Sequence, residues 1–178
     1  MQRILVMGSL GSGKSTFARQ LSAATGIPMV SIDALFWKPG WVEPDRTKFR
    51  ERLAETARQP RWIMDGNYPS HLLELRRDLS DTVIWFDLPR SICILGILKR
   101  TAKSYGRVRP EMAEGCPERV DIEFFRYVWT FRERQRPKLL GCFEALRPDQ
   151  SLIRFTDRTQ ADRYRSALTS SSNPALVH

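Results

Sequence analysis

A glycine-rich segment near the start of the chain has residue types and spacing that suit phosphate binding. Gly8, Gly13, Lys14 and Ser15 satisfy the pattern G-x-x-x-x-G-K-[ST], with an apolar strand before it and a periodic helix after it. In such a loop, backbone N–H groups surround oxygen anions, the lysine reaches the outer phosphates and the serine hydroxyl joins Mg²⁺. A turn that binds nothing would leave Lys14 without a partner at a buried helix start. The expected contacts of ATP and Mg²⁺ are Gly8, Gly11, Ser12, Gly13, Lys14, Ser15 and Thr16.

Two aspartates come at the ends of apolar runs and are candidates for work beside the phosphates. Asp65 ends the run WIMD, so its carboxylate should emerge at the C-terminal edge of the sheet and hold Mg²⁺ through water, together with Ser15. Asp33 ends the second strand-like run, where it could accept a proton from an acceptor hydroxyl as a general base. Either side chain could instead cap the helix or turn that follows it.

Arginines gather in and around an irregular segment punctuated by Gly and Pro, residues 106–119. A flap that closes over a nucleotide can bring guanidinium groups to the transferring phosphoryl, where charge spreads in the transition state. Arg126 would share a helical face with Arg119 if the helix reached that far back. Each arginine could also be a solvated surface charge. The candidates around the flap are Arg100, Arg107, Arg109, Arg119 and Arg126.

These residues need a scaffold, and the chain alternates strand-like apolar runs with helical segments. Such alternation predicts a parallel sheet with right-handed crossovers. The expected strands are 3–7, 28–33, 61–66, 82–88 and 151–157, and the clearest helices are 14–25, 45–59, 90–105 and 121–135. We therefore expect an α/β, three-layer P-loop NTPase fold with a five-stranded parallel sheet, helices on both faces and a short lid. The domain should span 1–168, with the lid at about 104–120 and a flexible tail at 169–178.

The charge and composition of the chain limit the classes of partner that it could bind. The formal net charge of +9 favours an anionic partner such as a nucleoside triphosphate, nucleic acid or a phosphorylated metabolite. The sequence has no recognisable helix-turn-helix or zinc module, so non-specific nucleic-acid binding stays open only as an alternative. The longest apolar run, 92–98, is too short for a membrane span, and we expect a cytoplasmic protein without membrane contact. Three widely spaced cysteines should be thiols: Cys93, Cys116 and Cys142.

Three classes of phosphate-loop protein could carry this motif: small-molecule kinases, regulatory GTPases and ATP-driven machines. The N-K-x-D element typical of GTPases is absent, and 178 residues leave little room for the extra elements of a motor. The sequence therefore favours a compact kinase.

Five segments together resemble the DNA topology modulation protein family, a group similar to adenylate kinase among the small P-loop kinases. They are the phosphate loop, IDALFWKPGWVEPDR, WIMDGNY, TVIWFDLPRS, and YGRVRPEMAEGCPER with the following DIEFFRYVWTF. The resemblance covers about residues 1–168 and implies a triphosphate-binding core, a lid and an acceptor-binding region. It also implies that Asp65-Gly66 matches the Asp-Gly at the end of the third strand of adenylate kinases. Arg100 and Arg107 resemble lid arginines, which makes them catalytic candidates beside Lys14 and Asp33.

Departures from adenylate kinases bear on the acceptor. Those enzymes hold the acceptor phosphate with one arginine after the second strand and another after the Asp-Gly, whereas these stretches here read DALFW and NYPS. Asp33 is placed as in shikimate and gluconate kinases, whose acceptors offer a hydroxyl. We expect an ATP-dependent phosphotransferase acting on a small acceptor hydroxyl. The alternatives are a nucleoside monophosphate kinase and a nucleotide-regulated DNA-binding protein.

Overall fold

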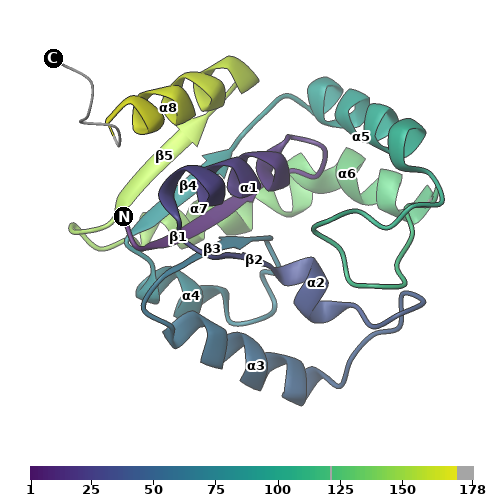
Figure 1. Cartoon of the computed structure of the whole chain (residues 1–178), viewed down its shortest axis with the longest axis horizontal. Helices are drawn as coiled ribbons and strands as arrows, with labels where there is room; N and C mark the ends of the chain where they lie inside the picture. The colour runs from purple at the N-terminus through teal and green to yellow at the C-terminus, as the bar shows by residue number, and fades with distance from the viewer. Residues whose placement is uncertain (121, 172–178) are drawn as a thin grey trace, which may run out of the picture.

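The computed structural model describes residues 1–120 and 122–171, and its centre is a parallel β-sheet (Figure 1). The five strands lie in the order β2-β3-β1-β4-β5, and all neighbouring strands are parallel. Their bounds are β1 Arg3–Gly8, β2 Met29–Ser31, β3 Trp62–Asp65, β4 Thr82–Phe86 and β5 Ser151–Phe155. Because the first strand is central, the loop that follows it opens at the middle of the carboxyl edge, where α/β folds place their ligands.

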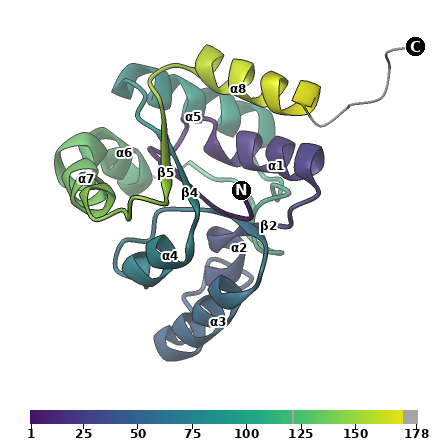
Figure 2. The same ribbon diagram turned by 90° about the vertical axis from the view of Figure 1, so that its left-hand side faces the viewer.

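Helices cover both faces of this sheet, which confirms the expected three-layer α/β fold (Figure 2). One face carries α1 (Lys14–Thr25), α5 (Arg90–Ser104) and α8 (Arg158–Ser171). The other carries α3 (Arg46–Arg58), α4 (Leu73–Leu79) and α7 (Arg136–Glu144). The short α2 (Ile32–Phe36) follows β2, and α6 (Ile122–Arg134) contributes side chains to the cores on both faces.

Strand periodicity explains the two cores. On β1, Ile4 and Val6 pack toward α1, whereas Leu5 and Met7 pack toward α3. Successive residues of a strand point to opposite faces, and a parallel sheet covered on both faces therefore reads as a continuous apolar run. All five expected strands and the four clearest helices are confirmed, within the usual uncertainty at element ends.

The second strand ends earlier than expected. β2 stops at Ser31, whose hydroxyl accepts a hydrogen bond from the Ala34 N–H at 3.3 Å and so caps α2. Asp33 is consequently in the first turn of α2 and not at a strand end. At the other end of the chain, α8 continues through Ser171 and includes the first residues of the expected tail; residues 172–178 lie outside the described part.

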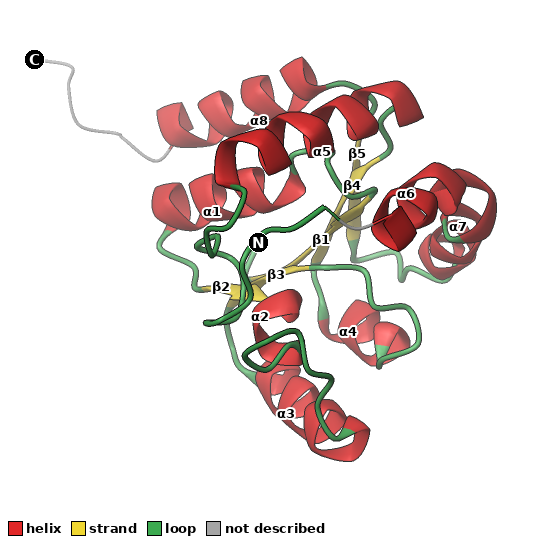
Figure 3. Ribbon diagram, turned by 90° about the vertical axis from the view of Figure 1, so that its right-hand side faces the viewer, coloured by secondary structure: helices red, strands yellow, loops and turns green. Residues whose placement is uncertain are grey.

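The expected lid is the loop that joins α5 to α6, and it lies beside the loop after α2 (Figures 1 and 3). Its base is closed by backbone hydrogen bonds from Gly106 N to Glu118 O and from Glu118 N to Arg107 O, both 2.9 Å. Three lid residues, Met112, Ala113 and Cys116, form a small apolar cluster with Trp37 and Trp41. These contacts join the lid to residues 37–42 across the carboxyl edge of the sheet.

None of the helices in the described part of the chain has both the length and the apolar character that a membrane span requires. The three cysteines are buried thiols, as expected: Cys93, Cys116 and Cys142.

Candidate active site

The phosphate loop connects β1 to α1 through backbone conformations that favour glycine. Gly11 has φ 77°, and a Cβ there would lie 2.1 Å from the Cys93 carbonyl oxygen. Gly13 has φ 101° and is the N-terminal cap of α1. This helix start has no side-chain cap and no acidic residue in its first turn. The unsatisfied N–H groups and the helix dipole therefore favour an anion at this position.

Lys14, Ser15 and Asp65 meet where β3 ends beside α1. Asp65 is 4% exposed and Lys14 is 9% exposed. Burial raises the pKa of the Asp65 carboxyl, while the Lys14 ammonium and a hydrogen bond with Ser15 act in the opposite direction. In the described structure, Asp65 Oδ1 is buried without a hydrogen-bond partner. An orphaned carboxylate oxygen beside a serine hydroxyl fits a hydrated Mg²⁺ that also binds phosphates.

A protein-only metal centre does not occur in this region. Within residues 1–120 and 122–171, no cluster of three or more histidine, cysteine or acidic side chains is arranged to hold a metal ion. Mg²⁺ typically needs only one or two carboxylates when phosphates complete its coordination. The donor set of Ser15 and Asp65 therefore suits a metal that arrives with a nucleotide.

Asn67 ties the phosphate loop to the end of β3, a role that its sequence context did not reveal. Its Oδ1 accepts a 2.9 Å hydrogen bond from Gly8 N, and its Nδ2 donates a 2.8 Å bond to Gly8 O. The side chain is buried. These two hydrogen bonds extend the pairing of β1 with the end of β3 by one residue, and they fix the point at which the loop leaves β1.

The loop after β3 is held by an arginine from α4. Arg76 is fully buried, and its Nη atoms donate to the carbonyl oxygens of Gly66, Asn67 and Tyr68 at 3.3, 2.8 and 3.0 Å. Burial lowers the pKa of Arg76 to about 10. Tyr68 has φ 39°, a left-handed conformation that costs on the order of 1–3 kcal/mol in a residue with a side chain. Arg76 is a positioning residue that helps to hold this conformation.

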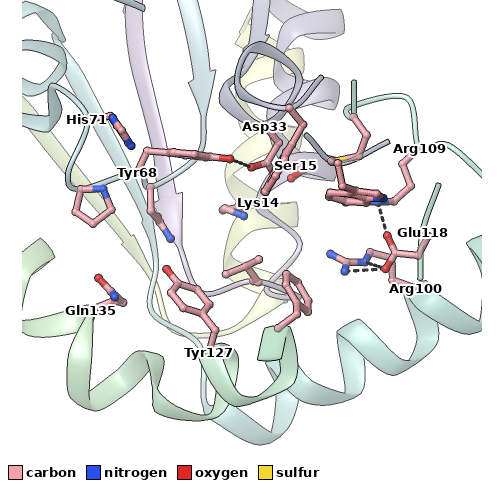
Figure 4. Close-up of a pocket in the computed structure, with 18 of the residues that line it drawn as sticks. Lys14, Ser15, Asp33, Tyr68, His71, Arg100, Arg109, Glu118, Tyr127 and Gln135 are labelled. Atoms are coloured by element: carbon pink, nitrogen blue, oxygen red, sulfur yellow. Dashed lines mark hydrogen bonds and ion pairs between the residues drawn. The ribbon is translucent and has the colours of Figure 1, made fainter. Parts of the chain in front are cut away.

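The strained Tyr68 points at Asp33 (Figure 4). Its hydroxyl donates a 2.7 Å hydrogen bond to Asp33 Oδ1. Burial and the neighbouring Asp33 carboxylate raise the pKa of the Tyr68 phenol above its ordinary value, so the phenol stays protonated and acts as the donor. Asp33 is half-buried, and this bond fixes the orientation of its carboxylate.

A cavity of about 510 Å³ opens between the phosphate loop, the lid and α6. Lys14, Ser15 and Asp33 line its centre, and Figure 4 shows the Lys14 ammonium directed into it. Trp37, which ends α2, and Trp41 in the loop after it also line the cavity. Further lining residues that the sequence did not single out are Tyr68, His71, Glu118, Phe124, Tyr127 and Gln135.

The arginines of the lid region separate into two groups. Arg100 and Arg109 flank the buried Glu118, with Arg100 Nη2 and Arg109 Nε each 2.8 Å from its carboxylate oxygens. Burial is the largest influence on Arg100 and lowers its pKa. Arg119 also lines the cavity and lies 5.3 Å from the Trp41 ring centre.

Two other arginines are not brought to the site. In the described structure, Arg107 and Arg126 are exposed and line neither this cavity nor the one on the other side of the phosphate loop, which is described below. Because α6 begins at Ile122, Arg119 and Arg126 do not share a helical face. Arg107 lies at the base of the lid, where its backbone N–H donates to Ser104 O at 2.9 Å and its carbonyl accepts from Glu118 N.

A second cavity of about 350 Å³ lies on the other side of the phosphate loop, between α1, α5 and α8. The phosphate-loop residues from Gly11 to Thr16 line it, as do Lys99 and Arg158. Arg158 Nη2 donates to the Gly11 carbonyl at 2.8 Å. Four side chains line both cavities: Lys14, Ser15, Arg100 and Arg109. The two cavities therefore meet at the phosphate loop.

Comparison with solved structures supports the fold. No protein-family model and no curated protein matches this sequence. Shikimate kinase from Bacteroides thetaiotaomicron is similar in structure with a TM-score of 0.56 at 18% identity, over 96% of this chain and 98% of that one.

Two further solved structures show the same likeness. Shikimate kinase from Acinetobacter baumannii, in complex with shikimate, has a TM-score of 0.53 at 15% identity, over 97% and 96% of the two chains. A gluconokinase from Sinorhizobium meliloti has a TM-score of 0.50 at 16% identity, over 96% and 93%. The fold is that of the small P-loop kinases. The finer resemblance to the DNA topology modulation protein family stays a prediction.

Proposed function

We propose that this protein is an ATP- and Mg²⁺-dependent phosphotransferase that moves the γ-phosphoryl group of ATP to a hydroxyl of a small acceptor. One observation carries the proposal: the two cavities meet at Lys14, Ser15, Arg100 and Arg109. The cavity lined by most of the phosphate loop suits the nucleotide, and the aromatic cavity with Asp33 suits the acceptor. Four groups able to bind phosphate or its metal lie at the junction, where transfer would take place.

The chemistry follows from these positions. Asp33 accepts the proton of the acceptor hydroxyl as its oxygen forms a bond to the γ-phosphorus. The bond from that phosphorus to the bridging oxygen breaks, and ADP leaves with the electron pair. Lys14, Arg100 and Arg109 stabilise the negative charge that spreads over the phosphoryl oxygens. Ser15 and Asp65 would hold Mg²⁺, which screens phosphate charge when it is bound.

The structural neighbours support this class of reaction, because they include a shikimate kinase and a gluconokinase. The nucleic-acid alternative gains no support from them. The proposal is tested by ADP formation from ATP and Mg²⁺ in the presence of a panel of small alcohols. Acceptor-dependent ADP release supports it. A protein that binds nucleotide but releases no ADP with any acceptor contradicts it.

A further inference from the structure

The acceptor cavity has an uneven distribution of charge from one end to the other. Its cationic side chains lie at the phosphate loop and the lid: Lys14, Arg100, Arg109 and Arg119. The opposite end is lined by residues 66–71, Tyr127 and Gln135, whereas the ring centre of Phe124 in α6 lies 5.2 Å from the Arg100 guanidinium at the cationic end. Figure 4 shows His71 and Gln135 on the far side of Lys14 from Arg100 and Arg109. Among the described residues that line the cavity, none with a permanent positive charge lies at this far end.

The arginines near the lid already have partners of opposite charge. Glu118 is 5% exposed and pairs with both Arg100 and Arg109. Arg109 Nη1 also lies 2.9 Å from Glu111 Oε1. Because these guanidinium groups face the phosphate loop, a triphosphate is the anion that can compete with Glu118 for them. A second anion on the acceptor would need another cation.

Two polar atoms at the far end are buried without a hydrogen-bond partner in the described structure: Gln135 Oε1 and His71 Nδ1. Burial is the largest influence on His71 and lowers its pKa, with Arg50, Arg46 and Arg76 acting in the same direction. The ring is therefore neutral at neutral pH. A neutral imidazole and an amide oxygen match hydroxyl groups, because each can be satisfied without a charged partner.

Three arginines near His71 do not alter this conclusion. The Nη atoms of Arg76 already donate hydrogen bonds to three backbone carbonyls. Arg46 and Arg50 are exposed on α3. In the described structure none of the three lines the cavity. Arg50 approaches this end only at the Ser70 carbonyl, to which its Nη1 donates at 3.4 Å. A carboxylate or phosphate at the far end would therefore be desolvated beside Asp33 without a cation in direct contact, which is unfavourable.

Aromatic side chains form part of the cavity wall. Trp37, Trp41, Tyr68, Phe124 and Tyr127 line the cavity around Asp33. Burial, with a contribution from Asp33, raises the pKa of Tyr127 to about 12, so this phenol also remains a hydrogen-bond donor at neutral pH. Aromatic rings with polar tips suit a ligand that has an apolar face and a hydroxylated edge.

We propose that the acceptor is an electrically neutral polyol, either a free sugar or the sugar of a nucleoside. One hydroxyl lies at Asp33 and receives the phosphoryl group, other hydroxyls bond to Gln135 and His71, and the carbon skeleton packs on the aromatic walls. This inference rests on the proposed phosphotransfer and names its substrate class. It differs from the anionic acceptors expected for a carboxylate-binding or monophosphate-binding site.

The first test measures binding in the presence of a non-hydrolysable ATP analogue and Mg²⁺, by calorimetry on the full chain. The panel contains neutral sugars and polyols (ribose, glucose, inositol), nucleosides (adenosine, thymidine), hydroxylated carboxylic acids (gluconate, shikimate) and monophosphates (AMP, glucose 6-phosphate). We expect a neutral compound to bind at least about tenfold more tightly than every acid and phosphate. Comparison of the free sugars with the nucleosides shows which of these two classes of neutral compound the cavity binds.

Two results of this binding test would overturn the inference. One is an acid or monophosphate that binds as tightly as the best neutral compound. The other is a panel in which no neutral compound binds with a Kd below about 10 mM. Turnover separates this inference from the proposed function: phosphorylation of an acid supports phosphotransfer but contradicts the neutral acceptor, whereas neutral binding without ADP release contradicts only phosphotransfer.

A variant tests the far end of the cavity directly. Gln135→Leu removes the amide while keeping similar size, and the Gln135 side chain makes no capping hydrogen bond for α7. We expect the Kd of the best neutral ligand to rise about tenfold while the Kd of the ATP analogue stays unchanged. Gln59→Leu, an exposed position at the end of α3, is the control and should change neither value. Unchanged neutral-ligand affinity in Gln135→Leu would contradict the assignment.

Discussion

Arg100 Nη2 lies 2.8 Å from Glu118 Oε1, and both side chains line the cavity of about 510 Å³. Glu118 also accepts hydrogen bonds from Thr101 at 3.0 Å and pairs with Arg109. The carboxylate thus occupies the position of an anion between two guanidinium groups beside the phosphate loop. It fixes the lid to α5, and under the proposed function phosphates would compete with it for the same arginines.

The first prediction concerns this carboxylate. Glu118→Gln removes a buried charge that faces two arginines, so the lid should loosen through repulsion between them. We expect amides of residues 106–118 to exchange about tenfold faster than in the unchanged protein, and a triphosphate analogue to restore most of the protection. Hydrogen exchange with mass spectrometry measures both states.

Glu114→Gln is the matched control, because Glu114 is exposed in the same lid. It should leave exchange unchanged. If the lid of Glu118→Gln exchanges equally fast with and without the triphosphate analogue, phosphates do not replace the carboxylate. If the lid of the protein without any substitution is equally protected in all ligand states, the lid is a fixed insert and not the mobile flap that we expect.

The second prediction concerns Lys14. Its side chain lines both cavities and reaches the junction where the phosphoryl group would move. Lys14→Ala should lower kcat/KM for ATP by about 10²–10³ because it removes one charge from the transition state. Lys48→Ala, on the exposed face of α3, should keep full activity. Steady-state ADP release tests this, with circular dichroism to verify the fold. Activity of Lys14→Ala within a few-fold of the unchanged protein would contradict the phosphate-loop assignment.

Local patterns were enough to predict the strand, glycine-rich loop and helix at the start of the chain, and the sheet. The loop is contiguous, and the apolar runs of strands such as β1 report burial on both faces. Asp45 before α3 and Gly26 after α1 mark helix ends, and both act as caps in the structure. Such signals depend on residues within a few positions of one another, so they can be recognised without knowledge of the tertiary fold.

The lining of the larger cavity could be predicted only in part, because its residues converge from distant segments. Tyr68 and Asp33 are 35 positions apart, and nothing in either local sequence marks the other as a partner. The choice between Arg107 and Arg109 depends on how the lid turns, which local sequence does not determine. His71 and Gln135 carry no motif. Their signal is a buried polar atom without a partner, which exists only in the folded structure.

The third prediction distinguishes the role of Asp33 from that of Tyr68, which donates a hydrogen bond to it. Asp33→Asn keeps the shape but removes the proton acceptor, so kcat should fall by about 10²–10⁴ while the Kd of ATP changes little. Tyr68→Phe removes only the 2.7 Å bond and should lower kcat by about tenfold. Measurement of kcat and of ATP binding for both variants tests the roles. An equal loss of ATP affinity in Asp33→Asn would place Asp33 on the nucleotide.

The fourth prediction follows from the burial of Asp65. Its pKa is raised in the folded chain, chiefly by desolvation, so the native state binds more protons than the unfolded state as the pH rises from about 3.8 toward the folded value. Stability attributable to this group is therefore greatest when it is protonated and decreases as the pH rises through that window. Above the window the unfavourable contribution is constant.

Asp65→Asn removes the ionisable group and keeps the shape. At pH 7 and without nucleotide, we expect the free energy of unfolding to rise by roughly 0.5–2 kcal/mol, with Mg²⁺-dependent turnover nearly abolished. The gain should shrink as the pH falls through the same window, because the carboxyl of the unchanged protein becomes neutral there. Asp78→Asn, an exposed position, should alter stability by less than about 0.5 kcal/mol. Urea unfolding across this pH range measures the difference. A loss of stability at pH 7 would mean that the electrostatic attraction of Lys14 outweighs desolvation, and Asp65 would then serve to balance the Lys14 charge before it serves a metal ion.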